Sequence, residues 1–332
     1  MGVILLMGLR ESFCGRAGPH RRVATRPAAA VFVAACLVAA VPLSSVTAQQ
    51  QPPATRARRA AVPPKPVAVP DSFVERAAAA ACLERELDPR GSLPIDVMQA
   101  RPSLPTRHPD VVEGARRAER MLPVARELAG EVLLRLMREH RVPAAVERAA
   151  LRRLGEARRV RADVELRDNA SVLYSDPRTI RFGTIFLAGL RSDEGVLSVL
   201  AHELVHTADG ARGELSQLFR RVGQRAERTG RTGRLSARRA EELTCDLVGL
   251  LAVRLFIERE PSDEPVARRA SRAVGHNCVE HDETDVTHLS PRQTLRALLA
   301  LEPAFAGQLT GDAPAALPAA PLNHTAPRRP RP

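Results

Sequence analysis

The segment from Val196 to His206 constrains the fold of this chain more than any other part of the sequence. It reads VLSVLAHELVH, so an apolar run leads directly into two histidines four residues apart with a glutamate beside the first. Residues i and i+4 lie on the same face of a helix, and the pattern predicts a buried helix at about 192–208 that presents both imidazoles on one side. Ionisable groups in an apolar helix are costly unless they have partners. The chain must therefore fold so that this face meets a metal ion or other polar groups.

The histidine pair has the spacing of a zinc site. Two imidazoles at i and i+4 can reach one ion at about 2.0–2.1 Å, and the intervening glutamate can reach a water on that ion. A catalytic zinc site takes three protein ligands and leaves a fourth position for water. The spacing therefore predicts one zinc ion, held by His202, His206 and a third side chain from elsewhere, with Glu203 as the catalytic base.

Glu242 is the favoured third ligand. Glu242 and Asp246 again stand four residues apart on a predicted helix, so that Glu242 could bind the metal while Asp246 accepts the outer ring N–H of a liganding histidine. The alternatives are Glu241, one position round the helix, and Asp209, three residues beyond the histidine pair. Acids are also common in the first turn of a solvated helix, so the alternative is that Glu241 and Glu242 are simply exposed residues of such a turn.

A family resemblance accompanies these motifs. The run from about Val164 to Asp246 resembles the HtpX-like and CAAX prenyl endopeptidase family of zinc metallopeptidases, which are gluzincins. HELVH and the downstream E-x-x-x-D of Glu242 and Asp246 are the specific part of the likeness. The other shared features, in the family's order, are Asn169-Ala170, a strand at Ile180–Thr184, Gly-Leu at 189–190 and an acid pair before the helix.

The resemblance implies a zincin-like metallopeptidase domain. In such a domain Glu242 would be the third zinc ligand, Asp246 would support a ligand from behind, and Ile180–Phe186 would be the edge strand that binds substrate as an added β-strand. The family also has a His-Pro followed by an Arg near the C-terminal end. The loose match at Thr287–Arg292 makes His288 and Arg292 candidates for binding the substrate carbonyl or the oxyanion.

The rest of the sequence predicts a predominantly helical α+β domain over residues 71–302, with a small β-sheet beside the HExxH helix. Aromatic residues are only 3% of the chain, so Ala, Leu and Val must fill the core. A helical N-terminal part at 71–158 precedes a catalytic part at 159–302, in which alternating apolar residues at 160–187 predict the sheet. Helices are expected at about 72–86, 111–140, 143–158, 192–208, 213–227, 236–259, 263–273 and 290–301.

The two ends of the chain have other compositions. Arginines followed by an apolar run and small residues predict an export signal over 1–48, with a lipid anchor at Cys36 as the alternative. Residues 49–70 are Pro-rich and predict a linker, and residues 303–332 predict a disordered tail. We therefore expect a periplasmic or secreted protein without a transmembrane segment in its mature chain.

The positive charge belongs mainly to these ends. The formal net charge is +12, yet most of the excess arginine lies in the first 70 residues and the last five, so the predicted domain is close to neutral. This distribution disfavours a nucleic-acid partner, which requires a basic patch on the folded domain. A basic stretch at 220–234 is interpreted as a solvated face.

Three cysteines remain beyond the predicted signal, and an oxidising compartment would allow one disulfide among them. The sequence leaves the pairing of Cys82, Cys245 and Cys278 open. The spacing of His276, Cys278 and His281 is compatible with a second metal site, and a polar surface loop is the alternative.

The function these features predict is that of an exported zinc-dependent endopeptidase. Such an enzyme hydrolyses peptide bonds of a peptide or protein substrate through a zinc-bound water that Glu203 activates. The alternative is a non-catalytic zinc-stabilised binding or chaperone-like module on the same scaffold. An intact Glu203 favours the enzyme, because a purely structural zinc site needs no base beside its ligands.

Overall fold

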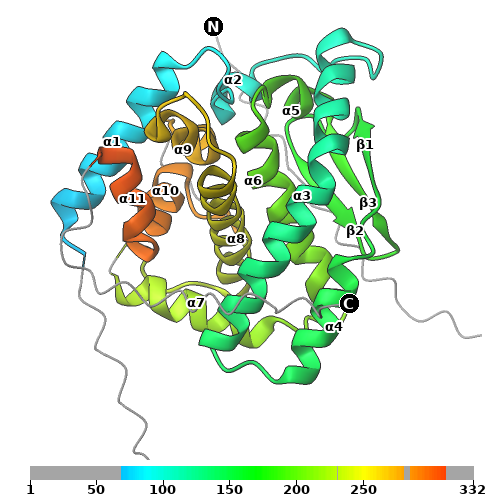
Figure 1. Cartoon of the computed structure of the whole chain (residues 1–332). Coiled ribbons are helices and arrows are strands. Elements are labelled where there is room, and N and C mark those ends of the chain that lie inside the picture. Colours follow the sequence, from blue (N-terminus) through cyan, green and yellow to red (C-terminus); the bar gives the residue numbers. More distant parts are fainter. Residues whose placement is uncertain (1–68, 230, 280–284, 312–332) are drawn as a thin grey trace, which may run out of the picture. The chain divides into compact units, whose positions relative to one another are not determined.

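Three helices, α3 (Pro109–Glu139), α6 (Asp193–Asp209) and α8 (Ala237–Arg259), pack against one another at the centre of the computed structural model (Figure 1). Each has apolar residues at helical spacing, and the middle of α8 reads LVGLLAV. Because all three contact each other, the expected N-terminal and catalytic parts share one core. The structure describes residues 69–229, 231–279 and 285–311.

Shorter helices surround this trio. In Figure 1, α1, α10 and α11 lie on one side of it, and α7 and α4 lie below. Serines cap the helix starts that the sequence predicts: Ser192 accepts a hydrogen bond from the backbone N–H of Gly195, and Ser290 stands before the first-turn Pro291 of α10. The remaining helices are α1 (Asp71–Leu87), α2 (Ile95–Gln99), α4 (Ala144–Leu154), α5 (Thr184–Gly189), α7 (Ser216–Arg228), α9 (Val266–Val274), the 3₁₀ turn η1 (Gly275–Asn277), α10 (Pro291–Leu301) and α11 (Pro303–Thr310).

The sheet has three strands in the order β1-β3-β2. The first, β1 (Arg159–Asp163), runs parallel to β3 (Asp176–Gly183), and β2 (Ala170–Leu173) runs antiparallel to it. The described residues thus form a predominantly helical fold with a small mixed sheet, which confirms the expected α+β class. The strand β2 contacts α6, so the sheet does lie beside the HExxH helix.

The expected edge strand at Ile180–Phe186 is wrong in two ways. Residues up to Gly183 belong to β3, which has a neighbour on both sides, and Thr184 begins α5. The physical reason is burial: Ile180 and Phe182 are fully buried, and such side chains favour the centre of a sheet. The antiparallel edge of this sheet is β2.

The expected disordered tail begins later than its predicted start at 303. Residues Pro303–Thr310 form α11, which packs on α1 and α9. Its apolar side chains drive this packing, since Phe305 is fully buried and Leu309 is 3% exposed. The rest of the expected tail from 312, the export signal at 1–48 and linker residues 49–68 lie outside the described residues.

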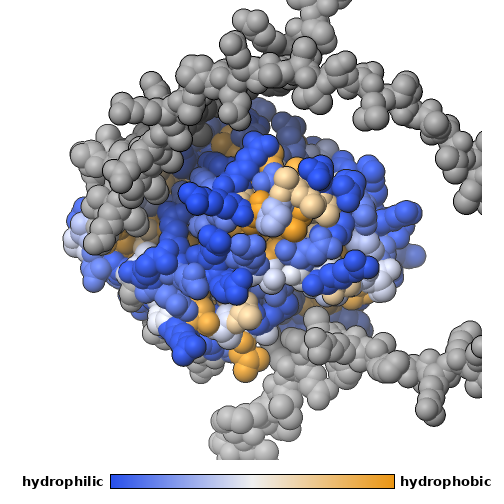
Figure 2. Space-filling model, turned by 90° about the horizontal axis from the view of Figure 1, so that it is seen from below, coloured by the Kyte–Doolittle hydropathy of each residue, from blue (hydrophilic) through white to orange (hydrophobic). Residues whose placement is uncertain are grey.

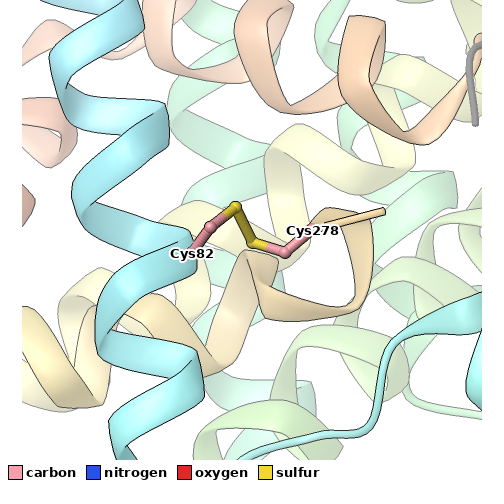
Figure 3. Close-up of a disulfide and its surroundings, with 2 residues drawn as sticks. All are labelled: Cys82 and Cys278. Atoms are coloured by element: carbon pink, nitrogen blue, oxygen red, sulfur yellow. A yellow bond between two sulfur atoms is a disulfide. The ribbon is translucent and has the colours of Figure 1, made fainter. Parts of the chain in front are cut away.

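A disulfide joins Cys82 of α1 to Cys278, the residue after η1 (Figure 3). It closes a loop across 196 positions of sequence and leaves Cys245 as a buried free thiol. This settles the pairing that the sequence left open. It also overturns the interpretation of Cys278 as a metal ligand, because its sulfur is bonded; the third member of that pattern, His281, lies outside the described residues.

Hydrophilic residues cover most of the face shown in Figure 2, with small apolar patches between them. That view looks from below, toward α7 and α4. On α7 the side chains of Arg220, Arg221 and Arg228 are exposed, consistent with the expected solvated basic face. Among the described residues, no helix combines the length and the apolarity that crossing a membrane requires.

Candidate metal centre

The candidate site forms where α6 and α8 lie face to face. Gly249 allows the close approach, because a Cβ at this position would lie only 2.6 Å from the backbone oxygen of Ser198. The histidines of α6 therefore meet the acids of α8. His202 and His206 keep 17% and 14% of their side chains exposed, whereas Glu242 is 5% exposed, so solvent reaches the rings but hardly reaches the carboxylate.

Three atoms at this crossing form a nearly equilateral triangle. His202 Nε2 lies 3.3 Å from His206 Nε2, and Glu242 Oε2 lies 3.3 Å from the first nitrogen and 3.4 Å from the second. Ligand atoms about 2.0–2.1 Å from a tetrahedral ion are separated by roughly 3.3 Å. The predicted ligands His202, His206 and Glu242 are therefore brought together in a geometry that could hold a metal ion.

Acids of α8 orient both rings through contacts to Nδ1, the ring nitrogen that does not face the triangle. Asp246 Oδ1 accepts a hydrogen bond from His202 Nδ1 at 2.8 Å, as the sequence predicts for this residue. Glu241 Oε1 lies 3.2 Å from His206 Nδ1. Each contact favours a proton on Nδ1, so Nε2, which faces the triangle, is the nitrogen that would bind a metal ion.

Two further side chains lie near enough to share an ion with these residues, namely Glu241 and Cys245. Both approach His206 at Nδ1, with the Cys245 sulfur 3.9 Å away. This nitrogen does not face the triangle, so the geometry favours Glu242 over its neighbour Glu241 as the third ligand. Burial raises the pKa of the Cys245 thiol, which favours its protonated form in the absence of a metal ion.

The other alternative ligand, Asp209, has a different contact. Its Oδ1 accepts a hydrogen bond from the backbone N–H of Leu215 at 2.5 Å, which fixes the loop that follows α6. Burial raises the pKa of Asp209 to about 6. The structure therefore gives Asp209 a role in the turn between α6 and α7.

Glu203 is a buried carboxylate for which the described residues provide no partner. It is 5% exposed, and within the described part of the chain no hydrogen bond or ion pair involves its carboxylate. Burial raises the pKa of Glu203, and the nearby charges of His202 and His206 only partly offset this. A buried carboxylate near the two histidines, with a raised pKa, suits a general base that must also return its proton.

Excess negative charge surrounds the two rings. Burial lowers the pKa of His202, but hydrogen bonds to Asp246 and Glu242 outweigh it, so the pKa lies well above its ordinary value. For Glu242, burial alone would raise the pKa. Hydrogen bonds from His202, His206 and His288 outweigh this effect and hold the pKa of Glu242 far below its ordinary value. Protons on the rings here do what a bound cation would do.

The structure separates the two candidates for substrate binding. His288 Nε2 lies 3.5 Å from Glu242 Oε2, and Asp285 and Thr287 contact its other ring nitrogen. The His288 side chain is 53% exposed, so it stands beside the triangle with one side open to solvent. Arg292 is not brought to the site; it lies exposed on α10 and lines a cavity of about 260 Å³ beside the disulfide.

Two residues near the site escaped the sequence analysis. Arg238 contacts the carboxylates of both Glu241 and Glu242, and its spacing of i+3 and i+4 could have shown this. Tyr174, the only tyrosine in the chain, follows the edge strand β2. Burial raises the pKa of Tyr174, and the charges of Glu241 and His206 act on it as well, although the residue is 46% exposed.

Comparison of the chain with models of protein families, with curated proteins and with solved structures finds no match. The resemblance to the HtpX-like family therefore depends on the motif residues alone. The arrangement of these residues in space is an independent observation, because it follows from the packing of α6 on α8.

Proposed function

We propose that this protein is a zinc-dependent endopeptidase with a zincin-like catalytic domain. The observation that carries the proposal is the triangle of two imidazole nitrogens and one carboxylate oxygen. Near it lies Glu203, a buried carboxylate that has no hydrogen bond or ion pair within the described residues. Two histidines and one glutamate are a ligand set typical of catalytic zinc, which keeps its fourth position open. The separations of the three atoms suit a small tetrahedral ion rather than calcium or magnesium, which prefer six or more oxygens.

A bound zinc ion would supply a Lewis acid and lower the pKa of a water at its open position toward about 7. Glu203 would take the proton of the attacking water as its oxygen adds to the carbonyl carbon. As the C–N bond breaks, Glu203 would pass this proton to the leaving amine, which its raised pKa favours. His288, beside Glu242 and open to solvent, would donate a hydrogen bond to the carbonyl oxygen.

The sheet offers a place for the substrate backbone. The strand β2 is antiparallel to β3, lies at the edge of the sheet and contacts α6. An extended peptide could add to such an edge through backbone hydrogen bonds, which would leave its side chains to select among sequences. We therefore assign substrate alignment to β2 in place of the segment that the resemblance indicated.

Export is part of the proposal. The N-terminal pattern of basic, apolar and small residues predicts a signal, and the disulfide between Cys82 and Cys278 fits an oxidising compartment. We expect the mature protein to be periplasmic or secreted and to begin near Gln49. N-terminal sequencing of the exported form would test this, and a lipid-modified Cys36 at the terminus would contradict it.

The change Glu203→Gln tests the enzyme directly. Glutamine keeps the size of the side chain but cannot accept a proton, so turnover of a quenched-fluorescent peptide library should fall by about 10²- to 10⁴-fold. Zinc content should stay at the wild-type value, because Glu203 is not a ligand. The matched control is Glu258→Gln, a glutamate at the other end of α8 whose loss should leave turnover unchanged.

Two results would count against this assignment. Equal turnover in wild type and Glu203→Gln would show that Glu203 is not the base. A wild type that binds zinc but cleaves no peptide would favour the non-catalytic zinc-stabilised binding or chaperone-like module.

A further inference from the structure

Arg238 stands in the first turn of α8 and reaches two acids one helical turn further on. Its Nη1 lies 2.8 Å from Glu241 Oε1, and its Nη2 lies 2.9 Å from Glu242 Oε1. A single planar guanidinium thus bridges two carboxylates, a geometry that its fixed fork of donors permits and a lysine ammonium does not.

The two oxygens of Glu242 have different partners. Oε1 pairs with Arg238, whereas Oε2 lies 3.3 Å and 3.4 Å from the two histidine nitrogens of the triangle. With its outer oxygen engaged, the carboxylate can offer the triangle one oxygen only. A metal ion held there would keep a position free for water, because Glu242 could not bind through both oxygens.

The same guanidinium acts on a second ligand through Glu241. Glu241 Oε1 accepts from Arg238 and also lies 3.2 Å from His206 Nδ1. Arg238 therefore restrains the acid that orients His206. The Arg238 side chain is 40% exposed, so part of it is open to solvent.

We propose that Arg238 is a positioning residue, which holds Glu242 as a one-oxygen metal ligand and, through Glu241, fixes the ring of His206. The inference rests on the proposed zinc site. Contacts of this kind behind metal ligands typically contribute about 10- to 100-fold to metal affinity.

Electrostatics alone predicts the opposite change in zinc affinity when Arg238 is removed. Removing a cation next to a cluster of acids would strengthen the binding of a divalent ion, since the site becomes more negative. Positioning and electrostatics can therefore be separated by the direction of the change in zinc affinity.

The experiment measures zinc dissociation constants of the full chain by competition with a chromophoric chelator, for wild type, Arg238→Ala and Arg238→Lys. We expect Arg238→Ala to raise the dissociation constant about 10- to 100-fold. Arg238→Lys should recover less than half of this loss on a logarithmic scale, because lysine keeps the charge but cannot bridge both acids. The matched control is Arg254→Ala, which removes an i,i+4 pair with Glu258 from the same helix and should leave the constant unchanged.

A second measurement does not depend on affinity. With cobalt(II) in place of zinc, Arg238→Ala should show weaker visible absorption than wild type, as five-coordinate sites do when a carboxylate binds through both oxygens. An unchanged or lower zinc dissociation constant in Arg238→Ala, or full rescue by Arg238→Lys, would overturn the positioning role. Failure of the wild type to bind zinc would instead overturn the proposed function, so the two failures are distinguishable.

Discussion

Two clusters of buried charged residues lie at opposite ends of α6, and they are balanced differently. At its start, Glu194 pairs with Arg269 at 2.7 Å and with Arg272 at 3.0 Å, and Arg272 also pairs with Asp88. All four side chains are at most 7% exposed. At the rim of this arginine cluster Glu264 contacts Arg272 and Arg90 lies 3.7 Å from Asp88, so the cluster holds three acids and three cations and is neutral without any ligand.

The cluster at the other end of α6 lacks that balance. Four carboxylates gather there around three histidines and one arginine: Glu203, Glu241, Glu242 and Asp246, with His202, His206, His288 and Arg238. The comparison shows that burial alone does not mark a functional site. We take a deficit of fixed positive charge as the better marker, because buried acids without counter-charges attract a cation.

The strongest test of this comparison removes the histidines. The double change His202→Ala and His206→Ala leaves one ligand of three, so zinc affinity should fall by more than about 10³-fold, or ~4 kcal/mol. The partner test is Glu194→Gln in the arginine cluster, which should leave zinc stoichiometry unchanged. Zinc content is measured on purified protein by atomic emission. Full retention of zinc in the double variant would place the metal elsewhere.

A second test breaks the arginine cluster. Arg272→Leu leaves Asp88 and Glu194 buried with too little positive charge, so the free energy of unfolding should fall by about 3–5 kcal/mol. Chemical denaturation measures this, and zinc content of the folded protein should remain at the wild-type value. A loss below about 1 kcal/mol would show that the cluster does not stabilise the fold, and would weaken the contrast between the two ends of α6.

The smallest effect is expected at Asp209, which lies beyond both clusters. Its pKa of about 6 exceeds the ordinary value of 3.8, so the folded state binds the proton more tightly and loses stability as pH rises from about 4 to about 6. Asp209→Asn removes the buried charge while its amide oxygen can still accept from Leu215 N–H. The variant should gain about 1–3 kcal/mol at pH 8 and almost nothing at pH 4.

Urea denaturation at both pH values checks this prediction. A gain of equal size at pH 4 and pH 8 would show that the effect of Asp209→Asn does not come from ionisation.

Local periodicity was sufficient for the longer helices and for part of the site, whereas the short helices α2, α5 and α11 were not predicted. The i, i+4 histidine pair lies on one helix, so its common face follows from helical geometry whatever the rest of the chain does. The pair Glu242 and Asp246 follows in the same way. Serine caps and first-turn prolines also act locally, and for this reason the starts of α6 and α10 were predictable from a few residues.

Contacts between segments far apart in the sequence could not be predicted from local periodicity. The sequence offered Glu241, Glu242 and Asp209 as third ligands, and only the approach of α8 to α6 at Gly249 determines which oxygen meets the imidazoles. The pairing of Cys82 with Cys278 likewise depends on where α1 lies against η1.

The sequence by itself thus determined the identity of the chemical groups, because they sit at helical spacing on two segments. The tertiary structure decided their combination: the carboxylate that meets the two imidazoles, the central position of β3, the helix α11 in the expected tail, and the bridge that Arg238 makes. The physical reason is the different range of these interactions along the chain. Capping and side-chain periodicity act over a few residues, whereas the neutrality or charge deficit of a buried cluster depends on which helices the core brings together.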